Sequence, residues 1–125
     1  ASGAGTATEA LTASRLGADI VKIFPAETLG GPRFIKLLLD PLPWLKLMPT
    51  GGVTLETLPA YYDAGAYAAG VASVLYDPDV MRRRDEDAIF TRVKALLSRI
   101  PAPAGLSVPD AATHEQKMRR PHEAR

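Results

Sequence analysis

The residue best suited to chemistry in this sequence is Lys22, which lies in a β-branched, apolar run that ends at Pro25. Side chains alternate along a strand, so Ile20, Lys22 and Phe24 are expected to share one face. An amine with apolar neighbours is expected to be desolvated, and desolvation favours the neutral form that attacks a ketone to give an imine. The alternative is an edge-strand lysine that opposes aggregation or extends into solvent.

Two glycine-rich segments form a second candidate constellation: Thr50-Gly51-Gly52 and Gly70-Val71-Ala72-Ser73. Both lie at the carboxyl ends of successive predicted strands, where the loops of parallel strands often bind phosphate through backbone N–H groups. We therefore predict a phosphate site made by Gly51, Gly52, Gly70, Val71 and Ser73. The Cβ of Ala72 is expected to crowd the anion. The alternative is that each glycine pair only makes a tight turn.

Further candidates surround these residues. Thr50 is predicted to hydrogen-bond a substrate or its phosphate, unless it only packs at the end of a strand. Phe24 is predicted as a wall of the pocket, with a core role as the alternative. Glu27 is interpreted as a solvated loop carboxylate rather than a catalytic one. The aromatic residues Trp44, Tyr61, Tyr62 and Tyr67 are interpreted as packing or subunit-contact residues.

Strands and helices must alternate to position these groups. We predict a helix from Thr6 or Thr8 to Gly17, a strand over 18–24, a helix from Gly30-Gly31-Pro32 to Asp40-Pro41, and a short strand over 45–48. Next we predict a third helix, which is capped by Thr57 rather than Thr54 and ends at Gly65. It is followed by a strand over 66–72, a charged loop over 82–87 and a last helix over 87–99.

This β-α-β-α order predicts a parallel sheet with right-handed crossovers. Three strands are too few for a closed barrel of eight, so half a barrel is the economical interpretation of residues 1–100. Residues 101–125 are rich in proline, alanine and charge, and are predicted to be a disordered tail. His114 and His122 are expected to be plain solvated residues of that tail.

Composition excludes several classes of function. The 125 residues are 46% hydrophobic and 23% charged, with a formal net charge of +1, so nothing favours a nucleic-acid or membrane partner. The absence of cysteine excludes disulfides, a thiolate nucleophile and a Cys-ligated metal. No apolar run approaches the ~20 residues that span a bilayer. We expect a cytoplasmic protein, and the small, flexible opening at Ala1 leads us to expect a chain cut from something longer.

The neighbourhood of Lys22 resembles a known signature. Gly17, Val21-Lys22-Ile23-Phe24-Pro25-Ala26 and Gly30 closely resemble the Schiff-base lysine motif of the KDPG/KHG aldolases, which act on 2-keto-3-deoxy-6-phosphogluconate and 4-hydroxy-2-oxoglutarate. Only Ile23 departs from the usual Leu or Phe. The resemblance covers roughly residues 2–99 in order, through Thr8-Glu9-Ala10-Leu11, Pro49-Thr50-Gly51-Gly52-Val53, Gly65-Ala66 and Gly70-Val71-Ala72-Ser73.

The resemblance implies an α/β fold, the C-terminal part of a (β/α)8 TIM barrel comprising strands six to eight with flanking helices. Ser2-Gly3-Ala4 would then be the remnant of the loop after the fifth strand. It also implies a class I aldolase of the Entner-Doudoroff pathway that uses Lys22, without cofactor or metal, to cleave KDPG into pyruvate and glyceraldehyde 3-phosphate. The alternatives are a phosphogalactonate aldolase of the same family and a non-catalytic phosphate-binding half-barrel.

Part of the implied machinery has no match in this sequence. The family's acid–base glutamate and carboxylate-binding arginine come from early strands, and members of the family are homotrimers. The chain is therefore expected to be an oligomer, and to be inactive without an N-terminal half.

Overall fold

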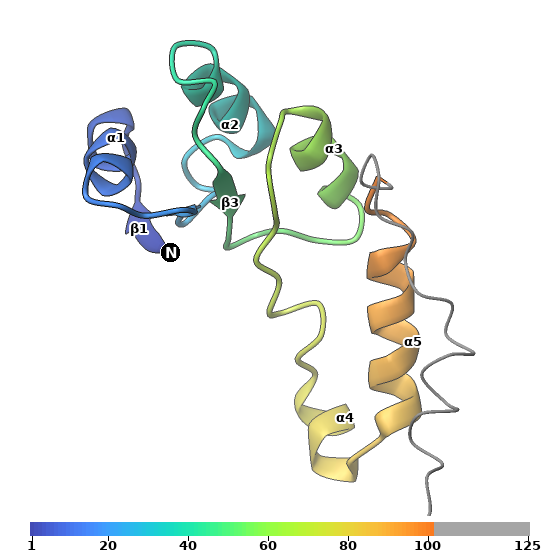
Figure 1. Cartoon of the computed structure of the whole chain (residues 1–125). Helices are drawn as coiled ribbons and strands as arrows, with labels where there is room; N and C mark the ends of the chain where they lie inside the picture. The colour runs from blue at the N-terminus through green and yellow to red at the C-terminus, as the bar shows by residue number, and fades with distance from the viewer. Residues whose placement is uncertain (102–125) are drawn as a thin grey trace, which may run out of the picture.

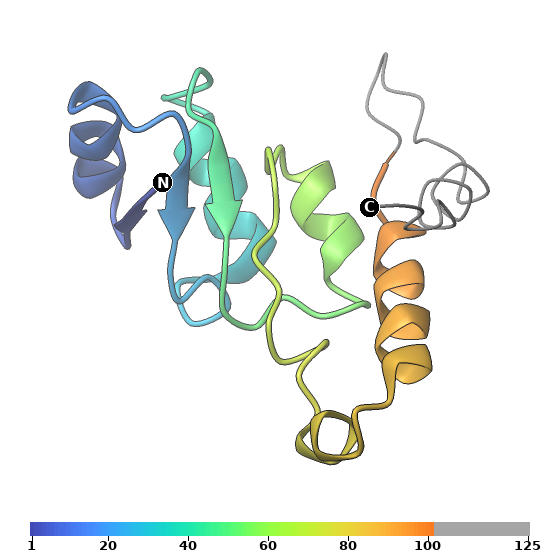
Figure 2. The ribbon, with the colours of Figure 1, turned by 60° about the horizontal axis from the view of Figure 1, so that its bottom comes forward.

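Parallel strands form a small sheet within residues 1–101, the part of the chain that the computed structural model describes. They are β1 (Ser2–Ala4), β2 (Val21–Ile23) and β3 (Leu47–Pro49), in the spatial order β1-β2-β3. Lys22 is paired with Gly3 on one side and with Met48 on the other. Helices connect the strands, and Figure 2 shows the strands running in the same direction. The parallel α/β arrangement predicted from the sequence is confirmed.

Helix α1 (Ala7–Arg15) begins at a reciprocal pair of side chains. Thr6 Oγ1 accepts a hydrogen bond from the N–H of Glu9 at 3.2 Å, and Glu9 Oε2 accepts from the N–H of Gly5 at 2.8 Å and from the Thr6 hydroxyl at 3.1 Å. These bonds, that from Gly5 above all, hold the pKa of the Glu9 carboxyl below its usual value. Of the two threonines that the sequence offered as caps, Thr6 is the cap.

We expect Thr6→Ala to lower the free energy of unfolding by about 1 kcal/mol, because the N–H of Glu9 loses its acceptor at the start of the helix. Thr8→Ala is the matched control, because within residues 1–101 the Thr8 side chain makes no hydrogen bond, and its backbone carbonyl, which accepts from the Thr12 hydroxyl at 2.8 Å, is kept. Urea denaturation of both variants measures the difference. A loss for Thr8→Ala as large as that for Thr6→Ala would contradict the assignment of the cap.

The core lies between one face of the sheet and the helices α2 (Gly31–Leu39) and α3 (Leu58–Asp63). Its most deeply buried members are Val21, Ile23 and Leu47 from the strands, Ile35 from α2, and Leu58 and Tyr61 from α3. Pro32 stands in the first turn of α2 and the helix gives way at Asp40, as predicted. Because Val21 and Ile23 face this core, Lys22 between them must face the other side of the sheet.

Helix α3 begins directly after Thr57, as predicted, but Thr57 makes no side-chain bond to the helix itself. Instead Thr54 Oγ1 accepts from the N–H of Thr57 at 3.2 Å, and Thr57 Oγ1 accepts from the N–H of Thr54 at 2.9 Å. The two threonines therefore close the preceding turn together.

Three expectations about strands need correction. Ser2–Ala4 is the strand β1 and not the remnant of a loop, because β2 supplies it with a parallel hydrogen-bonding partner. The strands predicted over 18–24 and 45–48 are shorter or shifted, at Val21–Ile23 and Leu47–Pro49. The segment 66–72 is no strand: it contacts β3 through the N–H groups of Tyr67 and Gly70, and its only bridge is Thr50 to Gly70. Within residues 1–101 no further strand lies on its outer side.

The C-terminal part contains a helix that the sequence analysis missed. Residues 82–83 belong to α4 (Pro78–Arg83), where a charged loop was predicted, and α5 runs from Glu86 to Leu97. Asp77 caps α4 by accepting from the N–H groups of Asp79 at 2.9 Å and Val80 at 3.3 Å. An Asp before a Pro is an ordinary helix-start signal, so the sequence did contain the information.

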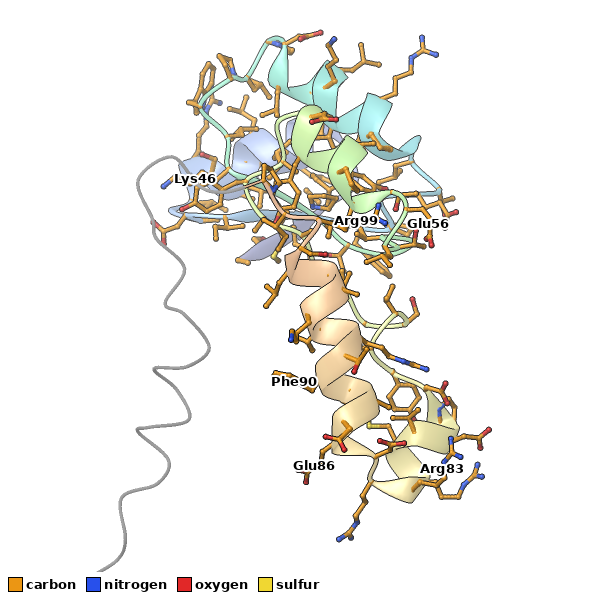
Figure 3. All side chains as sticks on the ribbon, turned by 90° about the vertical axis from the view of Figure 1, so that its right-hand side faces the viewer. Lys46, Glu56, Arg83, Glu86, Phe90 and Arg99 are labelled. Atoms are coloured by element: carbon orange, nitrogen blue, oxygen red, sulfur yellow. The ribbon has the colours of Figure 1, made fainter. Side chains whose placement is uncertain are left out.

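Helix α5 extends away from the sheet with α4 at its far end (Figures 1 and 3). Among its aliphatic residues, Leu96 is buried, Ile89 and Val93 are half-buried, and Leu97 is exposed. Phe90 points away from the helix into solvent (Figure 3). The apolar side chains of α5 are thus only partly covered.

The predictions for residues 102–125, including the tail and its two histidines, lie outside the described residues. Within residues 1–101 no helix has the length and hydropathy needed to cross a membrane, the longest being α5 with 12 residues.

Candidate active site

Lys22 occupies the middle of β2 and is half-buried, on the face of the sheet opposite to the core. Its Nζ lies 5.1 Å from the centre of the Phe24 ring, within the range of a cation–π contact. Beside it on β1 stands Gly3, where an added Cβ would meet nothing within 4 Å. The amine therefore has one aromatic neighbour and open space on the side of β1, which a substrate could enter.

The apolar enclosure predicted for this amine is incomplete. Phe24 is 55% exposed and Ile20 is half-buried, so neither seals Lys22 from water. Their positions at either end of a three-residue strand leave them without a covering layer on this face. The exposure of Phe24 contradicts the alternative that it is a core residue.

One pocket collects both glycine-rich segments. It lies at the carboxyl ends of β2 and β3, the end of the sheet at which α4 also lies (Figure 2). Its lining residues are Phe24, Thr50, Gly51, Gly52, Val53, Gly70, Ala72 and Ser73. Parallel strands end at one edge of a sheet, which predicts that the two segments meet there, and the structure brings them together at that edge.

A backbone bridge joins the two segments. Thr50 pairs with Gly70, and the N–H of Gly70 donates to the carbonyl of Pro49 at 2.8 Å. A Cβ on Gly70 would collide with the Oγ1 of Thr50, so glycine is required for this approach. Gly51 and Gly52 have positive φ angles of 87° and 77°, which L side chains rarely adopt. Gly51, Gly52 and Gly70 therefore both allow the tight backbone geometry and line the pocket.

Phe24 connects the pocket to Lys22. A Cβ on Gly51 would lie 3.1 Å from Phe24 Cε2, so the ring packs against the backbone of Gly51 while its face takes the cation. Lys22 itself does not line the pocket. The amine and the glycine loops thus stand on two sides of one aromatic ring.

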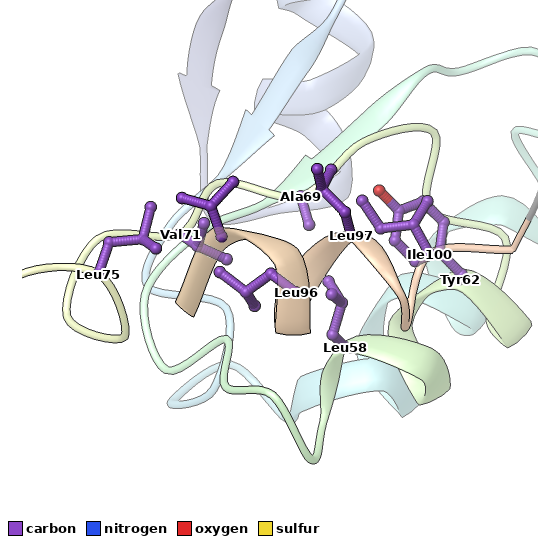
Figure 4. Close-up of a pocket in the computed structure, with 9 residues that line it drawn as sticks. Leu58, Tyr62, Ala69, Val71, Leu75, Leu96, Leu97 and Ile100 are labelled. Carbon is purple, nitrogen blue, oxygen red and sulfur yellow. The ribbon is translucent and has the colours of Figure 1, made fainter. Parts of the chain in front are cut away.

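Val71 is separated from the other predicted site residues. Its side chain points into an apolar cavity of about 140 Å³ between α3, α5 and the segment 69–75 (Figure 4). That cavity is lined by Leu58, Tyr62, Ala69, Val71, Leu75, Val93, Leu96, Leu97 and Ile100. Only the backbone of Val71 can therefore serve the pocket, and its phosphate-binding role stays a prediction.

Thr50 is half-buried, and its hydroxyl donates only a long bond of 3.4 Å to the carbonyl of Met48. Since a hydrogen bond of this length is weak, the hydroxyl can turn toward a ligand in the pocket at little cost. Its packing against Gly70 shows that it also has the structural role offered as the alternative.

Glu27 reaches closer to the pocket than the sequence indicated. It is exposed, as expected of a loop carboxylate, but its side chain lies directly over Gly52, in the space that a Cβ there would need. Its charge also acts on Tyr61, whose pKa is raised by burial first and by Glu27 second. The signal in the sequence was the pair Gly51-Gly52, because a residue without a Cβ leaves room for a neighbouring side chain.

The aromatic residues divide into two groups. Tyr61 is 1% exposed and packs in the core, and Tyr62 is half-buried. Trp44 and Tyr67 are largely exposed, and Lys46 Nζ lies 5.1 Å from the centre of the Tyr67 ring.

Among the described residues, no three His, Cys, Asp or Glu side chains are placed to hold a metal ion.

The chain is therefore an α/β protein built of parallel β/α units, with a lysine in mid-strand and glycine loops at the strand ends. The model of the family described as KDPG and KHG aldolase matches residues 1–92. The chain therefore belongs to the KDPG and KHG aldolase family.

Individual relatives agree with this assignment. The chain is 42% identical over 93 residues to the 2-dehydro-3-deoxy-6-phosphogalactonate aldolase of Escherichia coli (strain K12), covering 72% of this chain and 45% of the relative. It is 33% identical over 85 residues to the 2-dehydro-3-deoxy-phosphogluconate aldolase of Haemophilus influenzae, covering 68% and 40%.

The structure is also similar to that of the 2-keto-3-deoxy-6-phosphogluconate aldolase of Zymomonas mobilis ZM4 with 3-phosphoglycerate. The TM-score is 0.64 at 27% identity, covering 80% of this chain and 46% of the other. The chain thus spans somewhat less than half the length of the relatives it matches.

Proposed function

We propose that this chain carries the imine-forming part of a class I aldolase, with Lys22 as the nucleophile. The observation that supports it is the position of Lys22 in mid-strand, half-buried and beside the ring of Phe24, next to a pocket made of two glycine loops. We assign β2 to the sixth strand of a (β/α)8 barrel, which makes β1 part of the fifth.

The proposed reaction proceeds through a covalent adduct. The neutral amine of Lys22 attacks the C2 ketone, and with the uptake of one proton water leaves, which gives an iminium ion. The C3–C4 bond then breaks: its electron pair moves into the iminium to form an enamine, while the C4 hydroxyl loses its proton and becomes the aldehyde. Protonation of the enamine at C3 gives a second iminium ion, and its hydrolysis releases pyruvate and a proton and restores the neutral amine.

Binding of the substrate's phosphate is proposed for the pocket at Gly51 and Gly70. The N–H groups of Gly51, Gly52, Val71 and Ser73 donate to no acceptor within residues 1–101, so they remain available for an anion. The N–H of Gly70 is already bonded to Pro49, so Gly70 contributes space and not a donor. Thr50 and Phe24 are proposed to contact the substrate beside the phosphate.

We propose 2-keto-3-deoxy-6-phosphogluconate as the substrate. The phosphogalactonate epimer is the second candidate, and the 42% identity to the Escherichia coli phosphogalactonate aldolase favours it. Both epimers give the same two products, since they differ at C4, which becomes the aldehyde carbon. The family's homotrimer is the oligomer that we propose for the complete enzyme.

Cleavage by the 125-residue chain alone is expected to be slow, by about 10²–10⁴-fold, because nothing in the chain matches the family's acid–base glutamate. We expect a separately expressed N-terminal half of a relative to restore turnover when mixed with this chain. Coupled detection of pyruvate from each epimer, with either component alone as the control, measures this effect and the stereochemical preference. Full turnover by the chain alone would contradict the requirement for a second half, and no turnover of either epimer by the mixture would contradict the proposed function.

A further inference from the structure

The segment 70–76 forms a wall between two hollows. Gly70, Ala72 and Ser73 line the pocket proposed for phosphate, while Val71 and Leu75 point into the apolar cavity under α5 (Figure 4). The cavity has a volume of about 140 Å³. Close packing is what normally fixes a segment in place, and this segment lacks part of it on the cavity side.

The beginning of the segment is held by β3. The N–H of Gly70 donates to the carbonyl of Pro49, and the rest of the segment is closed by a turn in which Leu75 and Tyr76 donate to the carbonyl of Ala72 at 3.0 and 2.8 Å. That turn fixes the shape of the segment, but its hydrogen bonds do not reach the rest of the molecule, to which the segment is joined by the partial packing of Val71, Val74 and Leu75 against the core.

An attachment follows directly at Asp77. Arg92 of α5 donates from Nη2 to Asp77 Oδ2 at 2.8 Å, and each side chain is 35% exposed. The other oxygen of Asp77 caps α4. Among the side-chain hydrogen bonds of residues 1–101, this one alone joins residues more than four positions apart, and the others are local.

The chemistry of the pair suits a tether. Asp77 Oδ1 and Oδ2 accept from the backbone of α4 and from Arg92 at once, and the Arg92 bond is the chief cause of the lowered pKa of Asp77. A fully exposed ion pair contributes little, but a half-exposed carboxylate that is already oriented by two N–H groups loses less freedom when it pairs. Ile89 and Val93, on either side of Arg92 in the sequence, are half-buried, which anchors this part of α5.

We propose that Arg92 is a positioning residue for the pocket: through Asp77 it fixes the far end of the segment 70–76, and so the loop at Gly70–Ser73. This inference rests on the proposed function only for the identity of the ligand as a phosphate. Arg92 does not itself line the pocket and acts through Asp77 and the segment.

The test uses the 125-residue chain with Arg92→Met, which keeps an apolar stem, and Asp77→Asn, which keeps a good helix cap. Arg92→Lys keeps the positive charge but lacks the planar guanidinium group with its several N–H donors. Arg82→Met is the matched control, because it removes the 2.8 Å ion pair between Arg82 and Asp79 within α4, where both side chains are largely exposed. Amide hydrogen exchange is followed by NMR, and the affinity for inorganic phosphate by shifts of the Gly51 and Gly52 amides.

We expect the amides of Leu75 and Tyr76 to exchange about three- to ten-fold faster in Arg92→Met and Asp77→Asn, with Arg92→Lys intermediate and Arg82→Met unchanged. Amides of α2 should be unaffected, and phosphate should bind more weakly in the same order. Unchanged exchange in segment 70–76, or an equal acceleration in α2, would overturn the proposal. If the unaltered chain binds no phosphate, the proposed phosphate site fails, and the exchange rates still decide whether the tether exists.

Discussion

Lys22→Arg is expected to abolish the covalent adduct that the chain forms with pyruvate under borohydride reduction. Arginine keeps the positive charge and can retain the cation–π contact with Phe24, but its guanidinium does not become a neutral nucleophile near pH 7. The loss should therefore be complete, with no change in fold. Mass spectrometry of the reduced protein, and peptide mapping of the labelled lysine, measure the result.

The other lysines provide the internal control. Lys36, Lys46 and Lys94 are all exposed, and Lys46 and Lys94 also lie over aromatic rings, at 5.1 and 5.3 Å from the centres of Tyr67 and Phe90. An aromatic neighbour alone therefore does not distinguish Lys22, whereas its half-buried position in the sheet does. Lys46→Arg should leave the adduct intact. Adducts on these lysines in place of Lys22 would contradict the assignment.

The meeting of the two glycine loops could be predicted because it depends only on two neighbouring segments running in parallel. The segment 66–72 runs beside β3 without forming a strand, and the parallel bridge from Thr50 to Gly70 brings the two loops together at the carboxyl end of the sheet. The direction of individual side chains could not be predicted in the same way. Val71 turns toward α5 because the segment around it alternates between two hollows, and nothing in its local sequence distinguishes it from its neighbours.

The missed strand and the incomplete cover of Lys22 have a related cause. Ser2-Gly3-Ala4 has none of the β-branched residues typical of strands, and it is a strand because β2 offers it hydrogen bonds. Conversely, Ile20 and Phe24 are apolar, as is typical of a strand face that other segments cover. Their residue types do not show whether any segment packs over them. Sequence patterns therefore identified which face Lys22 occupies, while the degree of its burial depends on contacts between distant segments.

Gly70→Ala is expected to weaken the binding of a phosphorylated substrate more than the binding of a substrate without phosphate. The added Cβ would collide with Thr50 Oγ1, so Thr50 and Gly70 would have to separate, and the two loops of the pocket with them. We measure the concentration of keto acid that gives half-maximal trapping at Lys22, which needs no turnover. It should rise by about ten-fold or more for 2-keto-3-deoxy-6-phosphogluconate, as expected when charge-assisted hydrogen bonds are lost, and by much less for 4-hydroxy-2-oxoglutarate, which has no phosphate.

Two further variants separate loss of the phosphate site from general damage. Ala72→Gly removes a Cβ from the pocket wall, so it should lower the half-maximal concentration for the phosphorylated substrate. Thr50→Ala removes the hydroxyl and methyl groups nearest to the new Cβ, so it should restore part of the loss when combined with Gly70→Ala. Both variants change the space in the pocket where the phosphate is proposed to bind. Neither the gain from Ala72→Gly nor the rescue by Thr50→Ala should therefore be seen with 4-hydroxy-2-oxoglutarate. Equal changes for both substrates would mean that Gly70 serves only the turn, and that the phosphate binds elsewhere.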